Sequence, residues 1–353
     1  QPDWLTLDQT RPNLEDQGYP APTPEERFGA IRRFARRRLL WVAVRDLLGL
    51  AGMPEVGREL SDTADAAAAA ALAAVEEEVR RAEPFSALPP IPFVVIAMGK
   101  WGGRELNYSS DIDVLFVYDP PGGVDPDHAR RYATQVATEF MAALGRVTSD
   151  GAAFRVDADL RPEGKNGPLA RSLDGYRAYY QRWASTWEYQ ALIKARPAAG
   201  DLHLGQQFLD TVAPHVYPET LDPDAIRAVR TMKARIEYQA ELAGVSQQEI
   251  KRGFGGIRDV EFAVQLLQLV HGRFDEALRS PTTLEVLAVL AEYGYVRNTD
   301  AHALATSYRW LRNLEHRLQL WDLRQTHALP HDPPGRERLG KSLGYRDEPE
   351  RAA

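Results

Sequence analysis

Two aspartates separated by one residue, Asp111 and Asp113, stand at the start of an apolar run that ends at Tyr118. In a β-strand, alternate side chains point to the same face, so both carboxylates would lie together while Ile112 and Val114 pack on the opposite face. Carboxylate oxygens are the ligands that hard divalent cations prefer. The pattern therefore predicts a binding site for a divalent cation and for phosphates.

A glycine-rich polar segment precedes these aspartates and follows another apolar run, Val94–Met98. Glycines allow backbone N–H groups to approach a phosphate closely, and Lys100 adds a positive charge. The glycine spacing differs from that of a P-loop. In this part of the chain we predict that nucleotide or phosphate is bound by Gly99, Lys100, Gly102, Gly103, Ser109 and Ser110.

Residues 153–161 alternate apolar and charged side chains, which predicts a half-buried third strand with a charged face. Phosphoryl and nucleotidyl transfer commonly uses two metal ions held by carboxylates. Either Asp157 or Asp159 could supply a third carboxylate from this strand. Arg155 and Arg161 share its charged face and are predicted to bind phosphate and neutralise its charge.

The composition excludes several classes of protein. Of the 353 residues, 44% are hydrophobic and 26% are charged, as in soluble globular proteins. No apolar run approaches the length of a membrane span, and no signal peptide is evident. The chain has no cysteine, which excludes disulfides and thiolate metal sites. The net charge of -7 argues against nucleic acid as a partner, so we expect a cytoplasmic protein that binds neither nucleic acid nor membrane.

The hydrophobic patterns predict an α+β fold that is mostly helical, with a small mixed sheet and a C-terminal helical bundle. Thr23 is the expected cap of a first helix that ends near Leu50, and a second helix is predicted over Ser61–Glu83. Strands follow at 93–97 and 111–118, then helices at 126–144 and 172–196. Further helices are expected near 223–242, 257–270, 282–293, 300–320 and 334–343. The predicted parts are an N-terminal segment with helices (1–90), a catalytic core (91–218), a helical bundle (219–347) and a tail (348–353). Because the chain does not begin with methionine, we expect a fragment of a longer polypeptide.

Several other polar groups have two interpretations. The arginine run of the first helix could bind phosphate or RNA, but a solvated helix face is favoured. The aromatic residues of 176–189 could stack on adenine, but burial in the core is favoured. The helix start after Gly256 could bind an anion, and whether Lys251, Arg252 or Arg258 takes part stays open. Glu315 and His316 are interpreted as surface or capping groups.

His327 and His331 have a spacing that could bind zinc on a helix. Pro330 lies between them and would break that helix, so no zinc site is expected there.

Together these motifs resemble those of glutamine synthetase adenylyltransferases, bifunctional enzymes of the DNA polymerase β-like nucleotidyltransferase superfamily. The first motif, G-K-x-G-G-x-E-L-x-x-x-S-D-I-D, spans Gly99–Asp113, and the similarity extends over residues 25–340. The other matching stretches are Arg155–Pro162 with Gly167–Leu169, Trp187–Tyr189 with Lys194–Arg196, Lys251–Phe262 and Gln325–Pro330.

The resemblance implies a DNA polymerase β-like nucleotidyltransferase domain in the catalytic core. It implies that Asp111, Asp113 and Asp157 are catalytic and hold two Mg2+ ions, for which Mn2+ can substitute. Asp159 matches no aspartate of the family, so a charge on the strand face is its expected role. The implied partners are glutamine synthetase, a PII-type nitrogen signal protein, ATP or ADP, and inorganic phosphate.

The family polypeptide has two homologous catalytic halves. Residues 105–113, 256–258 and 325–330 look like the N-terminal half, which removes AMP from a glutamine synthetase tyrosine by phosphorolysis and releases ADP. Two alternatives stay open. One is ATP-dependent transfer of AMP onto glutamine synthetase, and the other is a regulatory module that binds glutamine synthetase or the signal protein without chemistry.

Overall fold

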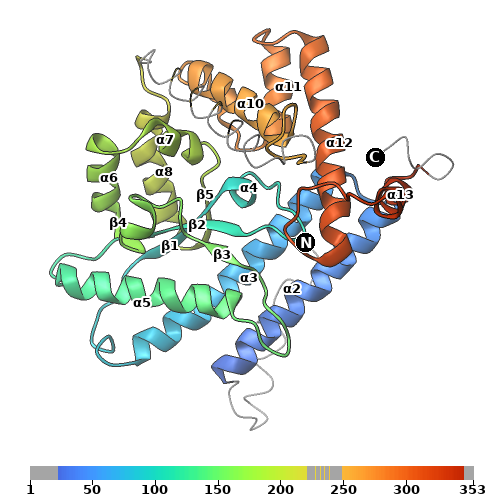
Figure 1. The fold of residues 1–353 in the computed structure, drawn as a ribbon. Coiled ribbons are helices and arrows are strands. Elements are labelled where there is room, and N and C mark those ends of the chain that lie inside the picture. The colour runs from blue at the N-terminus through green and yellow to red at the C-terminus, as the bar shows by residue number, and fades with distance from the viewer. Residues whose placement is uncertain are drawn as a thin grey trace.

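The computed structural model describes residues 23–220 and 249–345, together with positions 227, 231, 234 and 238. Helices surround a small mixed sheet, which confirms the predicted α+β, mostly helical fold (Figure 1). Within these residues no helix is long and apolar enough to cross a membrane. The first two helices, α2 (Pro24–Leu47) and α3 (Met53–Arg81), pack against each other along their length.

The structure confirms the predicted start of α2 but not that of α3. Thr23 caps α2 in a capping box with Glu26, as predicted. The predicted start of α3 at Ser61 is wrong, because the helix begins at Met53 with a proline in its first turn. The Ser61 hydroxyl donates to the carbonyl of Gly57 at 2.7 Å, a bond that a serine inside a helix makes.

The sheet has the order β3-β2-β1-β5, and β4 also pairs with β2. The predicted strands are confirmed as β1 (Phe93–Met98) and β2 (Ile112–Tyr118), which are antiparallel. Two short strands, β3 (Val156–Asp157) and β4 (Ala170–Ser172), run parallel to β2. The fifth strand, β5 (Arg196–Gly200), pairs antiparallel with β1 and was not predicted.

Helices cover both faces of the sheet. On one face lie α3 and α5 (Pro126–Gly145), and on the other lie α6 (Leu173–Arg182), α7 (Thr186–Leu192) and α8 (Leu202–Val216). Each face has its own buried apolar cluster, so the two central strands are apolar along nearly their whole length.

The prediction of one helix over the aromatic segment 172–196 is wrong. The segment consists of the end of β4, then α6, α7 and the start of β5. Its tyrosines 176, 179 and 180 are buried, which confirms their assignment to the core. The core assignment is wrong for Trp183 and Trp187, which are 74% and 41% exposed. The helix α8, which follows β5, was also missed.

The third strand is much shorter than predicted. Only Val156 and Asp157 form it, because the chain turns directly afterwards. The Asp157 carboxylate accepts the N–H of Asp159 at 2.7 Å, and the Arg161 N–H donates to the carbonyl of Ala158. Such a side-chain bond to the backbone two residues on is typical of turns and competes with strand pairing.

The described residues after 249 form helices and turns. The predicted helices are confirmed as α10 (Ile257–His271), α11 (Thr283–Glu292), α12 (Asn298–Asp322) and α13 (Pro333–Ser342). The helix predicted over 223–242 falls largely outside the described residues. The ribbon shows α12 next to the short helix α4 (Gly99–Gly102) that follows β1 (Figure 1). In the described part of the chain, short 3-10 helices also lie at Gly164–Asn166 and Glu276–Arg279.

Candidate active site

Three aspartates meet at one end of β2. Asp113 lies in register with Asp157 in the parallel pair of β2 and β3, and Asp111 directly precedes β2. The carbonyl of Arg155 accepts the N–H of Ile112 at 2.9 Å, which fixes this register. The structure thus places the carboxylates from both motifs at the same edge of the sheet.

The Asp113 carboxylate rests against the backbone of Gly99. A Cβ atom at Gly99 would lie 2.3 Å from Oδ2 of Asp113, and this glycine has a positive φ of 54°. Burial, together with the nearby charge of Asp157, raises the pKa of Asp113 to about 7, while Lys251 acts in the opposite direction. The charges of Lys251 and Lys100 do not offset the burial of this carboxylate, which forms no close ion pair among the described residues.

The Asp111 carboxylate has such a partner. The Nε atom of Arg155 donates to its Oδ1 at 2.5 Å, and Nη2 donates to the carbonyl of Ser109 at 2.9 Å. The Arg155 side chain, for which we predicted a phosphate contact, therefore holds the segment that leads into β2.

Oxygen ligands for a divalent cation are present in this arrangement. Among the described residues, no group of three His, Asp or Glu side chains has metal-binding geometry, and the carboxylate of Asp111 is engaged by Arg155. The donor chemistry nevertheless fits a hard cation, because three carboxylates gather at one edge of the sheet, where burial and the charges of Asp157 and Asp111 raise the pKa of Asp113. In chemical type, these residues fit Mg2+ or Mn2+.

The glycine segment, Gly99–Gly103, packs more tightly than a phosphate-binding loop requires. A Cβ atom at Gly102 would lie 1.8 Å from the carbonyl oxygen of Lys194, and one at Gly103 would lie 2.9 Å from that of Pro281. These two glycines are thus needed where backbones approach closely. Further along the chain, Ser109 is buried and Ser110 is half-buried. The Ser109 N–H donates to the side chain of Gln319 on α12 at 2.9 Å.

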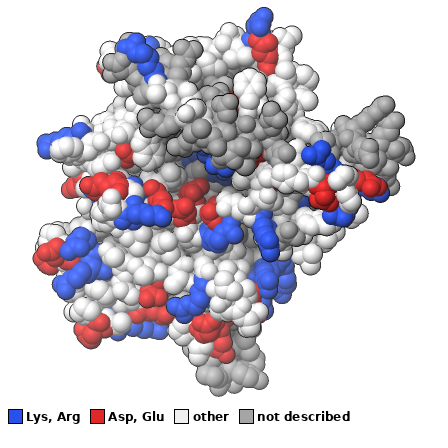
Figure 2. Space-filling model, in the orientation of Figure 1, with Lys and Arg blue, Asp and Glu red and all other residues white. Residues whose placement is uncertain are grey.

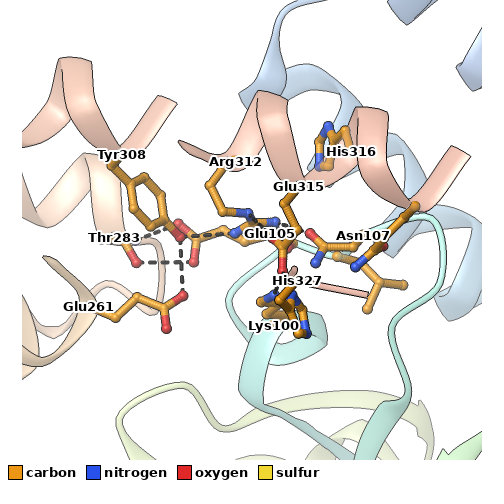
Figure 3. A network of polar contacts seen from close by, with 12 residues as sticks. Lys100, Glu105, Asn107, Glu261, Thr283, Tyr308, Arg312, Glu315, His316 and His327 are labelled. Atoms are coloured by element: carbon orange, nitrogen blue, oxygen red, sulfur yellow. Dashed lines mark hydrogen bonds and ion pairs between the residues drawn. The ribbon is translucent and has the colours of Figure 1, made fainter. Parts of the chain in front are cut away.

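The side chain of Lys100 points toward α12 (Figure 3). Its Nζ atom lies 2.8 Å from Oε1 of Glu315, and only 11% of the side chain is exposed. Burial lowers the pKa of Lys100 to about 8, although Glu315 acts against this. The ammonium group that was predicted to bind phosphate is therefore paired inside the protein.

The interpretation of Glu315 and His316 as surface groups is wrong, because both are fully buried. Glu315 belongs to a buried network that joins α12 to the segment before β2 (Figure 3). In this network, Nη2 of Arg312 donates to the carbonyl of Glu105 at 2.6 Å, and the Glu105 carboxylate pairs with Lys194 at 2.6 Å. The sequence does hold a signal for it, since polar residues recur at 312, 315, 316 and 319 of an otherwise amphipathic helix.

The loop before α10 brings one cation toward the aspartates. The N–H and guanidinium of Arg252 bind the carboxylate of Glu249, and Arg258 lies over the ring of Phe262. The charge of Lys251, by contrast, lowers the pKa of Asp113. Of the three cations left open in this loop, Lys251 is the one whose charge acts on Asp113.

The charges of the third motif have local partners. Arg161 donates to the carbonyls of Ala158 and Gly167, so it stabilises the turn after β3. Asp159 pairs with Arg161 and with Lys165, as expected of a surface charge. On the face seen in Figure 2, acidic and basic side chains lie next to each other in a band across the middle. That face is therefore not a uniformly basic surface.

Comparisons with known proteins address the identity of the chain. A family model described as glutamate-ammonia ligase adenylyltransferase matches residues 5–211, which is more than half of the chain. The chain belongs to this family. A second model, described as GlnD PII-uridylyltransferase, matches residues 227–353. The family resemblance seen in the motifs is confirmed.

Curated relatives within the glutamate-ammonia ligase adenylyltransferase family are much longer. A protein of Streptomyces avermitilis is 48% identical over 320 residues, which cover 91% of this chain and 31% of that protein. One of Mycobacterium tuberculosis is 51% identical over 282 residues, 80% of this chain and 26% of that protein. Both are named bifunctional glutamine synthetase adenylyltransferase/adenylyl-removing enzyme. The chain thus spans about a third, or less, of these relatives.

Proposed function

We propose that this chain removes AMP by phosphorolysis from an adenylylated tyrosine of glutamine synthetase and releases ADP. The observation that carries the proposal is the register of Asp113 with Asp157, directly beside Asp111. Carboxylates gathered on neighbouring strands are the arrangement that nucleotidyl transfer needs, and membership of the family supports the same chemistry. On this proposal, β1 to β5 form a DNA polymerase β-like nucleotidyltransferase domain.

The three aspartates would hold two Mg2+ ions, or Mn2+ in their place. Bound there, the cations would neutralise the charge of the phosphoryl oxygens. Gly99 gives the Asp113 carboxylate its place, because any side chain at that position would occupy the same space. Arg155 holds Asp111 in this structure. A cation bound by Asp111 would replace this ion pair and would leave the guanidinium of Arg155 available to phosphate.

The proposed reaction exchanges one phosphorus–oxygen bond for another. An oxygen of inorganic phosphate attacks the adenylyl phosphorus in line with the tyrosine oxygen. The bond from phosphorus to that tyrosine oxygen breaks, ADP forms, and the tyrosine oxygen takes up a proton. We expect electrostatic stabilisation of the transferring group to supply most of the rate enhancement in such a step. We place the reaction in the cytoplasm, under control of a PII-type signal protein.

The names of the relatives carry both directions of transfer, so a second reaction is a candidate. Transfer of AMP from ATP to an unmodified tyrosine would use the same carboxylates. A third candidate is a module that binds glutamine synthetase or the signal protein without chemistry. In that case the carboxylates would be dispensable.

One experiment separates the three candidates. The purified chain is incubated with adenylylated glutamine synthetase, Mg2+, inorganic phosphate and a PII-type signal protein, and the release of ADP is followed. A parallel reaction uses unmodified glutamine synthetase and labelled ATP. We expect ADP release that is abolished in Asp113→Asn. Label on glutamine synthetase without ADP release would favour the second candidate, and binding without either product would favour the third.

A further inference from the structure

A single buried carboxylate on α12 contacts three basic side chains. Glu315 lies 2.8 Å from Nζ of Lys100, 3.0 Å from Nε of Arg312 and 2.9 Å from Nδ1 of His327 (Figure 3). Its side chain is fully buried. Although burial acts in the opposite direction, Lys100 and His327 hold the pKa of Glu315 well below its usual range. The carboxylate is therefore ionised at any pH at which the protein works.

The contact with Lys100 leads directly to the aspartates. Lys100 follows Gly99 in α4, and the Asp113 carboxylate rests against the backbone of Gly99. The ion pair joins residues 215 positions apart in the chain. Fixing the Lys100 side chain on α12 therefore fixes the turn of α4 on which Asp113 rests.

The contacts of Glu315 with His327 and Arg312 also connect it to segments near the aspartates. His327, which pairs with Glu315, accepts the N–H of Ile250 through its carbonyl at 2.9 Å, directly before Lys251. Arg312 binds the carbonyl of Glu105 and the side chain of Asn107 on the way to Asp111. Each partner of Glu315 thus lies on a segment that bounds the candidate site.

We propose that Glu315 is a positioning residue for the adenylyl-transfer site. Its charge holds α4 beneath Asp113 through Lys100 and holds the loop of Lys251 in place through His327. Lys100 is then itself a positioning residue and does not contact phosphate. The proposal rests on the proposed function, but its first two tests below use no substrate.

The alternative is that the ion pair only stabilises the fold. Buried ion pairs can often be replaced by apolar side chains of similar volume without loss of stability. Partners that orient metal ligands behave differently, since their substitution typically costs ten- to a hundredfold in metal affinity or activity. Measurements of local order, metal affinity and turnover therefore distinguish the two roles.

The experiment compares Glu315→Gln, which keeps the shape and removes the charge, with Glu59→Gln. Glu59 is a matched control, because its carboxylate on α3 also forms ion pairs with two cations, Arg38 and Arg45 of α2. Hydrogen exchange is measured on the full chain without ligand, and Mn2+ binding is measured with the metal alone. For Glu315→Gln we expect faster exchange at Gly99–Gly103 and a loss of Mn2+ affinity of about tenfold or more. For Glu59→Gln we expect neither change.

Phosphate kinetics decide the role of Lys100. If Lys100 acts only by position, then Lys100→Met, Glu315→Met and the double variant lose kcat by similar factors, and the KM for phosphate changes less than about threefold. A large rise in the phosphate KM of Lys100→Met alone would overturn the positioning role of Lys100.

Glu315→Asp keeps the charge on a shorter side chain and is the second variant if Glu315→Gln fails to fold. Partial recovery of Mn2+ affinity in Glu315→Asp, relative to Glu315→Met, supports the proposal. Unchanged exchange and unchanged Mn2+ affinity in a folded, charge-free variant overturn it. The two proposals can fail separately. If the wild-type chain releases no ADP but Glu315→Gln still binds Mn2+ more weakly than the wild type, the proposed function is rejected and the positioning role is kept.

Discussion

The guanidinium of Arg155 lies 2.5 Å from the carboxylate of Asp111 and also binds the carbonyl of Ser109. The same arginine therefore neutralises one of the three aspartates and fixes the chain that leads into β2. About half of its side chain is exposed, so the pair is in contact with solvent. A positive charge in this position competes with any cation that Asp111 would bind.

Arg155→Gln should therefore raise the affinity of the chain for Mn2+ in the absence of nucleotide. An exposed ion pair contributes roughly 0.2–1 kcal/mol, which corresponds to an increase of about 1.4- to fivefold. Titration calorimetry at low ionic strength measures the change. The difference should shrink in high salt, because exposed pairs are screened. An equal or lower affinity of Arg155→Gln at low salt would contradict the competition.

Gly99→Ala should abolish adenylyl removal, because its Cβ atom would occupy the position of an Asp113 oxygen. The positive φ at Gly99 adds backbone strain on the order of 1 kcal/mol. Gly122→Ala is the control, since a Cβ atom there meets nothing within 4 Å. ADP release and the denaturant midpoint are compared for both variants. Full activity in Gly99→Ala would mean that Asp113 does not need its present position.

Asp157→Asn and Asp159→Asn form a matched pair, because Asp157 ends β3 and Asp159 lies two residues later in the turn that follows. Asp157 lies in register with Asp113, whereas Asp159 pairs with Arg161 and Lys165 near the surface. We expect ADP release to fall at least a hundredfold in Asp157→Asn, the lower range for loss of a charge-stabilising group. In Asp159→Asn it should change by less than about threefold, because exposed pairs contribute little. Equal losses would show that Asp159 also acts in the site.

Lys194→Met should destabilise the protein by about 3–5 kcal/mol, because it leaves the Glu105 carboxylate buried without its cation. The double variant with Glu105→Gln should recover part of this loss, since the amide oxygen can still accept the N–H of Thr283. Arg177→Met removes an exposed pair and is the control, with an effect within about 0.5 kcal/mol. Urea unfolding measures all three. A double variant as unstable as the sum of the singles would exclude coupling.

His316→Phe should protect the protein against acid. Burial and the nearby charge of Arg312 lower the pKa of His316 from 6.5 to about 3, while Asp46 acts in the opposite direction. Below pH 6.5 the unfolded chain binds a proton that folded His316 does not, so stability falls as the pH decreases from 6.5 toward 3. Above pH 6.5 this effect is absent.

Between pH 8 and pH 5, the free energy of unfolding of His316→Phe should therefore fall by about 2 kcal/mol less than that of the wild type. Phe also suits the edge-on contact of the His316 ring with Tyr108. Urea unfolding at both pH values gives the comparison, and the exposed His302→Phe on the same helix is the control. The same pH dependence in wild type and His316→Phe would contradict this account.

Local patterns were sufficient to predict β1, β2 and the carboxylates at their end. An apolar run, a glycine segment and an alternating pair of aspartates are each visible within a few residues. By contrast, β5 has the sequence Arg-Pro-Ala-Ala-Gly, which carries little preference for a strand. It becomes a strand because it pairs with β1, and that pairing cannot be seen in its own sequence.

The part of the candidate site on α12 escaped prediction for a different reason. A polar stripe on an amphipathic helix normally faces water, and by that rule Glu315 and His316 are interpreted as surface or capping groups. In the structure the stripe includes Arg312, Glu315 and Gln319, which are buried. Their partners, Lys100, Glu105 and Ser109, lie about two hundred positions earlier in the chain. The recurrence of polar residues reveals the stripe, but only the tertiary contacts show that it lies on the buried side of the helix.

This long separation also bears on how the protein is made. Arg312 and Glu105 meet across 207 positions of sequence, so the segment before β2 leaves the ribosome long before its partner helix exists. Contacts this distant in sequence form late, since a large loop must close first. The strands β1 and β2 can pair early, but the carbonyl of Glu105 lacks its Arg312 partner until α12 has been synthesised. Competence for metal binding should therefore appear only as translation nears residue 320, and nascent chains arrested before that point provide a direct way to time it.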